Sequence, residues 1–158
     1  NSLEEGISLY LLFFLQRIQM RIEVSSNLEV KLMRSGCTPW ILISDYLNEY
    51  VGVESCNLLP ISFVDLTPSE CTGPFEKFKE DVSSIHHVLE IVEFTKKMLD
   101  SDLLYVSCDM GVSRSSAIAN GLIDLFSLNQ SKFRPPRYSP NPWINSLFKK
   151  MNSYLSKV

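Results

Sequence analysis

The sequence lacks an excess of positive charge. Its 158 residues include 15 Lys and Arg against 18 Asp and Glu, which gives a net charge of -3, and no long basic run occurs. A nucleic-acid-binding domain normally shows a basic patch or stripe. We therefore predict that nucleic acid is not a partner.

The sequence is also poor in cysteine. Its 4 cysteines are Cys37, Cys56, Cys71 and Cys108, and they form no C-x-x-C pair and no His/Cys cluster at zinc spacing. Small secreted domains held together by disulfides are much richer in cysteine. We therefore expect four reduced thiols, with Cys37 and Cys56 in the core, in a cytoplasmic protein that binds no metal.

No hydrophobic run is long enough to cross a membrane. The longest, residues 7–15 (ISLYLLFFL), is about half of the roughly 20 residues that a spanning helix needs. Apolar residues recur every three or four positions between Leu3 and Ile18, which predicts a helix that is apolar on almost all sides. We predict that residues 1–19 form a helical extension, which packs on its own domain or pairs with a second copy in a homodimer.

The rest of the chain, residues 20–158, alternates short apolar runs with helical patterns. The expected strands are 22–24, 40–44, 58–64 and 103–106, and the expected helices are 74–92, 113–126 and one that begins at 141. Continuous apolar runs are typical of strands buried on both faces of a parallel sheet. The alternation predicts one α/β domain, with a central, mostly parallel sheet flanked by helices.

One segment carries a nucleophile. Cys108 follows the expected strand 103–106, and Arg114 opens the helix that comes after the next loop. Backbone N–H groups of such a loop can point inward and bind an anion, and the helix N-terminus adds positive charge. A thiol in that field ionises readily, and the planar guanidinium of an arginine matches two phosphate oxygens. The expected phosphate-binding residues are Asp109, Met110, Gly111, Val112, Ser113 and Arg114.

Two further residues of this segment have a chemical use. Gly111 permits backbone angles that a side chain would forbid. Ser115 can donate a hydrogen bond to the Cys108 sulfur, which helps the sulfur to leave when water cleaves a phosphoenzyme. We therefore predict that Cys108, Arg114 and Ser115 act together on a phosphate ester.

The segment 107–115, Ser-Cys-Asp-Met-Gly-Val-Ser-Arg-Ser, resembles the signature loop His-Cys-x2-Gly-x2-Arg-Ser/Thr of the cysteine-dependent protein tyrosine and dual-specificity phosphatases. Residues 63–65 (Phe-Val-Asp), 111–116 and 138–142 (Tyr-Ser-Pro-Asn-Pro) follow in an order that is similar to the small bacterial tyrosine phosphatase-like proteins. The resemblance extends from about residue 21 to the C-terminus and leaves the N-terminal segment unaccounted for.

The resemblance implies a hydrolase for phosphotyrosine or dual-specificity phosphoprotein substrates, or for small phosphomonoesters, that works through a phosphocysteine intermediate. Such an enzyme needs no metal and no cofactor. It does need a general acid, and the resemblance implies Asp65 for that role, with Asp45, Asp81 and Glu70 as rivals. A rhodanese-like sulfurtransferase also uses a cysteine in an anion-binding loop, but Ser115 and an acid have clear uses only in phosphoryl hydrolysis.

The sequence departs from the family pattern immediately before the nucleophile, where Ser107 stands in place of histidine. The chain is therefore either a slower phosphatase or a pseudo-phosphatase that binds phosphorylated partners. The loop between Cys108 and Arg114 contains no Lys or Arg, which disfavours a highly charged lipid headgroup as substrate. A basic segment, 132–137, is either a solvated loop or a lip for acidic phosphopeptides.

Overall fold

A computed structural model describes residues 2–17, 20–50 and 52–157, without the side chains of residues 10–17. The elements in chain order are α1 (Ser2–Arg17), β1 (Arg21–Ser26), α2 (Asn27–Met33), β2 (Trp40–Ile43), η1 (Leu47–Tyr50), β3 (Leu58–Ile61), η2 (Pro68–Glu70), η3 (Gly73–Phe78), α3 (Ile85–Lys97), β4 (Leu103–Cys108), α4 (Arg114–Leu125) and α5 (Pro142–Leu155). The η elements are 3-10 helices.

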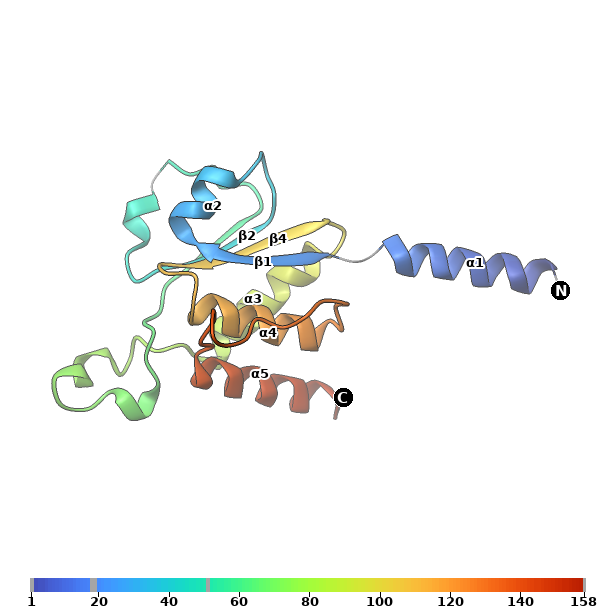
Figure 1. The fold of residues 1–158 in the computed structure, drawn as a ribbon. Helices are drawn as coiled ribbons and strands as arrows, with labels where there is room; N and C mark the ends of the chain where they lie inside the picture. Colours follow the sequence, from blue (N-terminus) through green and yellow to red (C-terminus); the bar gives the residue numbers. More distant parts are fainter. Residues whose placement is uncertain (1, 18–19, 51, 158) are drawn as a thin grey trace.

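The strands form one parallel sheet in the order β1-β4-β2-β3. Helix α2 covers one face of the sheet, and α3, α4 and α5 lie on the other face (Figure 1). The predicted α/β fold with a parallel sheet flanked by helices is confirmed. Because all four strands run in the same direction, the segments that follow their carboxyl ends meet at one edge of the sheet.

The core is divided by the sheet. Alternate residues of β2 point to opposite faces, so that Ile41 and Ile43 join the larger cluster with α3, α4 and α5, and Trp40 and Leu42 join the smaller cluster under α2. All four side chains are completely buried. Burial of each such side chain stabilises the folded state by roughly 1.5–3 kcal/mol, and together they hold β2 in its place in the sheet.

The predicted helix 74–92 is wrong in its first half. Pro74 opens only the short η3, and the chain then leaves the helical conformation before α3 begins at Ile85. Ser84 caps α3 by accepting a hydrogen bond from the His87 backbone N–H, and this cap sets the start of the helix. Asp81 therefore lies in the preceding loop and not in a helix. The strand expected over 58–64 ends at Ile61.

The expectation of four reduced thiols is wrong for Cys37 and Cys56, which form a disulfide with a Cα–Cα distance of 5.3 Å. The two residues precede the neighbouring strands β2 and β3, which pair Trp40 with Leu58, so strand pairing brings them together. Neither is a core residue, because Cys37 is exposed and Cys56 half-buried. The cytoplasmic location was expected because the thiols were expected to be reduced, and the disulfide removes that argument.

The same place holds the carboxylate of Glu54, whose oxygen lies close enough to both sulfurs for the three residues to share a metal ion. The sulfurs are bonded to each other, however, and a metal ligand would have to be a thiolate. The described geometry therefore fits a disulfide and not a metal centre at this position.

The N-terminal segment is helical, as predicted. Helix α1 extends away from the sheet in Figure 1, and its described apolar side chains Leu3, Ile7 and Leu9 are exposed. The other apolar side chains on which the dimer hypothesis depends lie outside the described residues, so the homodimer stays a prediction. No helix in the described ranges has both the length and the apolar character needed to cross a membrane.

Candidate active site

The nucleophile predicted from the sequence lies at the carboxyl end of β4, in the middle of the sheet. Cys108 is buried, and its Sγ atom lies 3.1 Å from the Oγ atom of Ser115 in the first turn of α4. The structure thus brings these two residues together across the loop 109–113. A hydroxyl at this distance can donate a hydrogen bond to the sulfur, and it does so most strongly when the sulfur is a thiolate.

The loop that follows Cys108 has a constrained shape. Gly111 has a φ of +69°, and a Cβ atom there would lie 2.5 Å from the carbonyl carbon of Ser25 and 2.6 Å from the backbone nitrogen of Ser26. No other residue type fits without moving the end of β1. Met110 points outward and is 78% exposed. Of the predicted phosphate-binding residues, Met110 can thus contribute only its backbone.

A later segment of the chain supports the loop from outside. The backbone N–H groups of Ser139 and Asn141 donate hydrogen bonds to the carbonyl oxygens of Val112 and Ser113, at 3.2 Å in each case. The Ser116 hydroxyl also donates to the Val112 carbonyl, at 2.6 Å. These bonds satisfy the carbonyl oxygens of Val112 and Ser113 on the outer side of the loop. A loop with its carbonyl groups engaged outside can turn its N–H groups inward, toward an anion.

Arg114 is the buried cation of the site, with 6% of its surface exposed. Its Nη1 atom donates to Asp45 Oδ1 at 2.5 Å and to the Phe63 carbonyl at 2.7 Å, and its Nη2 atom donates to Asp109 Oδ2 at 3.0 Å. Its Nε atom has no hydrogen-bond partner among the described residues. A buried N–H without a partner is costly, and an acceptor oxygen of a bound anion would satisfy it.

The charge state of Arg114 follows from its neighbours. Burial alone lowers the pKa of the guanidinium, but the Asp45 carboxylate, the Cys108 sulfur and the Asp109 carboxylate together raise that pKa above its ordinary value. Arg114 is therefore a full cation near neutral pH. This fixed positive charge beside Cys108 is what a phosphate ester needs in order to approach a sulfur nucleophile.

Ser107, which replaces the family's histidine, belongs to a buried network. Trp40 Nε1 donates to Ser107 Oγ at 2.7 Å, and Ser107 Oγ donates to Asn27 Oδ1 at 2.5 Å. All three residues are 0% exposed. The hydroxyl of Ser107 is thus fully used, and it links the core to the first residue of α2.

Asn27 extends this hydrogen-bond network to the loop. Its Nδ2 atom donates to the Ile43 carbonyl at 2.8 Å and to Asp109 Oδ1 at 3.1 Å. Ser44 Oγ donates to the same Asp109 oxygen at 2.9 Å. The carboxylate of Asp109 is consequently held on one side by two neutral donors and on the other by Arg114. Asp109 therefore orients the guanidinium, in addition to any use of its backbone N–H.

Asp65, the predicted general acid, lies against the outer side of the loop. Its Oδ1 atom accepts hydrogen bonds from Ser113 Oγ at 2.9 Å and from Asn141 Nδ2 at 2.8 Å. The residue is exposed, whereas Asn141 is 4% exposed and also caps α5 through its Oδ1 atom. The structure thus brings Asp65 to the same edge of the sheet as Cys108, from a segment that follows β3.

The three rival acids have other surroundings. Asp45 is bound to Arg114, as described above. The Glu70 carboxylate accepts from the Thr67 backbone N–H at 2.8 Å and caps η2. Asp81 is exposed in the loop before α3. Among these carboxylates, Asp65 is the one that hydrogen bonds to the loop without being occupied by Arg114.

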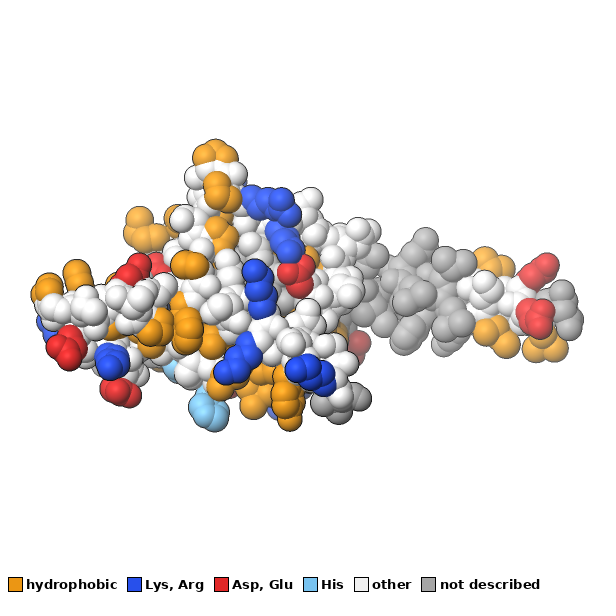
Figure 2. All heavy atoms as spheres, turned by 90° about the horizontal axis from the view of Figure 1, so that it is seen from below, with side chains coloured by type: hydrophobic (Ala, Val, Ile, Leu, Met, Phe, Trp, Pro, Cys, Tyr) orange, Lys and Arg blue, Asp and Glu red, His pale blue; other side chains and the backbone are white. Residues whose placement is uncertain are grey.

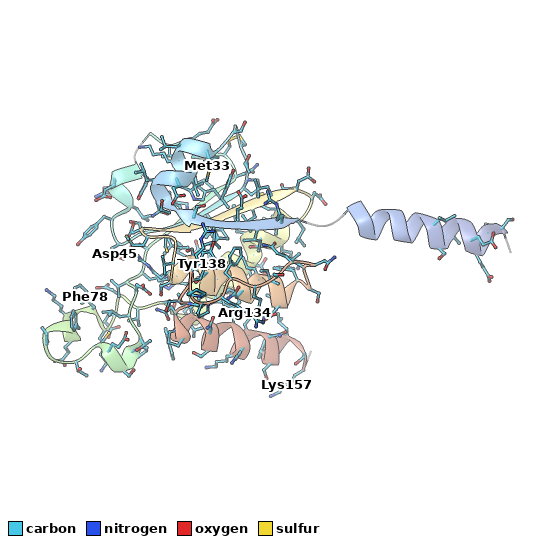
Figure 3. The ribbon with its side chains drawn as sticks, viewed as in Figure 1. Met33, Asp45, Phe78, Arg134, Tyr138 and Lys157 are labelled. Atoms are coloured by element: carbon cyan, nitrogen blue, oxygen red, sulfur yellow. A yellow bond between two sulfur atoms is a disulfide. The ribbon has the colours of Figure 1, made fainter. Side chains whose placement is uncertain are left out.

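A groove begins beside the loop and extends toward η3. It has a volume of about 570 Å³ and is lined by Asp45, Tyr46, residues 62–66, Phe75, Phe78, Glu80, Asp81 and His87. In Figure 3, Asp45 lies at the edge of the sheet and Phe78 lies on the segment that projects from it. Asp45 and the Phe63 carbonyl both contact Arg114, so the groove wall adjoins the guanidinium, although Arg114 is not among the lining residues.

Three residues of the site were missed in the sequence, namely Asn27, Trp40 and Ser44. Asn27 lies 80 positions from Ser107 in the chain and Trp40 lies 67 positions away, so only the strand order β1-β4-β2 brings them together. One local signal was present, because Ser26 and Glu29 form a capping box that marks the end of β1 and the start of α2. Asn141 was predicted as the cap at the start of the last helix, which is confirmed, but its hydrogen bond to Asp65 was missed.

No protein-family model matches the chain, and no curated protein matches it. Solved structures do match. The chain is similar to PTPMT1 in complex with PI(5)P, with a TM-score of 0.54 and 16% identity over 89% of this chain and 96% of that one. A second structure of PTPMT1 gives a TM-score of 0.54 and 17% identity over 89% and 95% of the two chains.

The human tyrosine phosphatase-like serine/threonine/tyrosine-interacting protein is also similar, with a TM-score of 0.50 and 14% identity over 84% of this chain and 87% of that one. Identities this low establish a shared fold and no more. The resemblance to the cysteine-dependent tyrosine and dual-specificity phosphatases is therefore confirmed at the level of the fold, while the nearness to bacterial members stays a prediction.

Proposed function

Starting from this phosphatase fold, we propose that the chain is a cysteine-dependent phosphomonoester hydrolase that acts on phosphoprotein. The observation that carries the proposal is the arrangement of Cys108, Ser115 and Arg114 around one loop. The thiol lies 3.1 Å from a hydroxyl, and the Nε–H of a buried guanidinium beside it has no partner in the described part of the chain. A nucleophile and a fixed cation at one place suit attack on an anionic ester.

In the first step, the Cys108 thiolate attacks phosphorus and a sulfur–phosphorus bond forms. The bond from phosphorus to the ester oxygen breaks, and Asp65 donates its proton to that oxygen, so that an alcohol or phenol leaves. The loop N–H groups and Arg114 hold the phosphoryl oxygens throughout. Position supports Asp65 as the acid, because its hydrogen bonds to Ser113 and Asn141 keep it beside the loop.

In the second step, water attacks the phosphocysteine. The Asp65 carboxylate takes one proton from the water, the sulfur–phosphorus bond breaks, and its electron pair returns to sulfur. Ser115 donates a hydrogen bond to the departing thiolate, which its distance to Cys108 allows. Inorganic phosphate leaves, and Asp65 is again protonated for the next cycle. The residues present supply every proton that this sequence needs.

One alternative has a specific observation behind it. Ser107 stands where the family has histidine, and its hydroxyl is used inside the core and does not face the sulfur. A structural neighbour is itself named a tyrosine phosphatase-like interacting protein. The same loop without turnover would make this chain a pseudo-phosphatase that binds phosphorylated partners. The intact Cys108, Arg114 and Ser115 favour the hydrolase.

Hydrolysis of para-nitrophenyl phosphate in the presence of EDTA tests the proposal. We expect turnover by the native chain, none by Cys108→Ser, and a loss of about 10²-fold or more by Asp65→Asn. Glu76→Gln is a matched control, because Glu76 lies in η3 and does not line the groove. Absence of turnover in the native chain, together with saturable binding of vanadate, would replace the hydrolase by the pseudo-phosphatase.

A further inference from the structure

The groove beside the loop is strongly acidic. Four carboxylates line it, those of Asp45, Asp65, Glu80 and Asp81, and no Lys or Arg is among its described lining residues. Asp45 is occupied by Arg114, and Glu80 and Asp81 form no ion pair with a described residue. Two carboxylates are thus available to a ligand that enters the groove from the loop.

The one basic side chain in the groove does not offset this charge. His87 accepts a hydrogen bond from the Ser84 backbone N–H on Nδ1 at 3.0 Å, and its ring lies 5.2 Å from that of Phe63. Burial lowers the pKa of His87, Glu90 raises it and His86 lowers it, and the net direction is downward. The imidazole is therefore mostly neutral near pH 7, and the groove has a net negative charge.

The walls of the groove also present apolar surface. Tyr46 and Phe75 line it with 70% and 49% of their surfaces exposed. Lys77 lies over the Phe78 ring at 5.1 Å but is not a lining residue, and it shows that a cation is accepted against this aromatic segment. Aromatic faces beside carboxylates bind the alkyl stem and the charged head of Lys or Arg.

The phosphate end of a ligand is fixed independently of these acidic residues. Arg114 is more than nine-tenths buried, and its Nε–H is unpartnered among the described residues. Two of its contacts, Asp45 and the Phe63 carbonyl, are themselves part of the groove wall. The neighbours of a phosphorylated residue bound at Arg114 would enter the groove past Asp45 and Phe63, which share its wall with Glu80 and Asp81.

We infer that the substrate is a phosphorylated peptide segment with Lys or Arg next to the phosphorylated residue. This inference rests on the proposed function, since it uses the same phosphate-binding place. A phosphoinositide headgroup is the wrong match, because its further phosphates would face the carboxylates of the groove. The basic segment with Arg134 lies beside α4 and α5, apart from Asp45 and Phe78 (Figure 3).

The distribution of charge on the surface agrees with this choice of ligand. Figure 2 shows most of the visible Lys and Arg side chains over the middle of the domain, and a mixture of hydrophobic, acidic and a few basic side chains at the end formed by η2 and η3. In the basic segment, Lys132 is paired with Asp124 at 2.6 Å and Arg137 lies over the Tyr138 ring. These cations are thus engaged on their own surface and not in the groove.

The test uses the full chain carrying Cys108→Ser and fluorescein-labelled phosphotyrosine peptides flanked either by Lys or by Glu. We expect the Lys-flanked peptide to bind about tenfold more tightly, as a few partly exposed ion pairs would allow. Glu80→Gln should reduce that preference about threefold, and the matched variant Glu76→Gln should not change it. Vesicles of phosphatidylcholine with PI(5)P should not compete.

Equal affinities, a preference for the Glu-flanked peptide, no binding of either peptide, or displacement by the PI(5)P vesicles would each overturn the inference. Turnover of para-nitrophenyl phosphate by the native chain separates the two proposals. Turnover without the Lys preference overturns the substrate class alone. The Lys preference without turnover supports the same phosphopeptide as a bound ligand and overturns the hydrolase.

Discussion

Trp40 Nε1 donates a hydrogen bond of 2.7 Å to the Ser107 hydroxyl, directly before the nucleophile in the chain. The indole and the Asn27 amide fill the space around a side chain that is 0% exposed. A small residue at position 107 is thus matched to a large one at position 40. The departure from the family pattern is therefore part of a complementary core and not an isolated loss.

This relationship predicts the effect of restoring the histidine. Ser107→His should lower the free energy of unfolding by about 1–3 kcal/mol, because a larger ring overpacks a filled site. Turnover of para-nitrophenyl phosphate should not rise. Urea denaturation and initial rates measure the two quantities. A Ser107→His chain of unchanged stability with faster turnover would show that the space is not closed.

The close contact of Gly111 with β1 predicts that a larger residue at this position weakens anion binding. Gly111→Ala places a Cβ atom 2.5 Å from the Ser25 carbonyl carbon, at a φ of +69°. The loop must therefore move away from β1, and vanadate affinity should fall at least tenfold while the protein still folds. Gly36→Ala is the matched control, because it has a φ of +55° but open space around it. Equal vanadate affinity in both variants would argue against the close approach.

Substitutions of Asn141 can separate its role as the cap of α5 from its role in positioning Asp65. Asn141→Asp keeps an oxygen that can cap α5 but replaces the amide that donates to Asp65 with a like charge. The melting temperature should change little, and turnover should fall by about tenfold or more as Asp65 leaves the loop. Asn141→Ala should lower both stability and turnover. Unchanged turnover in Asn141→Asp would show that Asn141 does not position Asp65 for catalysis.

The lowered pKa of His87 predicts that the free energy of unfolding depends on pH. Burial lowers its pKa below the ordinary histidine value of 6.5, so the unfolded chain takes up a proton at a pH at which the folded chain does not. The unfolded state then binds more protons, and the free energy of unfolding falls as the pH falls through and below 6.5. His87→Gln preserves the capping geometry and should flatten this fall. The exposed neighbour provides the control, His86→Gln, which should retain the fall.

The sequence was informative where the structure is local. Cys108, Gly111, Arg114 and Ser115 lie within one strand–loop–helix segment, so their spacing, together with the strand before it and the helix after it, predicted their grouping. Trp40 and Asn27 reach Ser107 only through the order of the strands, which no spacing reveals.

Two predictions were wrong for different reasons. The disulfide between Cys37 and Cys56 depends on the pairing of β2 with β3. The helix expected from Pro74 failed because apolar spacing continued through a segment that the Ser84 cap interrupts. A tertiary contact thus decided the first case, and a local cap decided the second against the pattern of apolar residues.

The central claim is that Cys108 forms a covalent bond to phosphorus and that Ser115 assists its cleavage. The most direct measurement is the mass of the peptide that contains Cys108, after Ser115→Ala has been mixed with para-nitrophenyl phosphate and rapidly denatured. Loss of the hydroxyl that lies 3.1 Å from the sulfur should slow the second step, so the account predicts one phosphoryl group accumulating on Cys108. An unmodified Cys108 during continuing turnover, or a phosphoryl group on another residue, would contradict it.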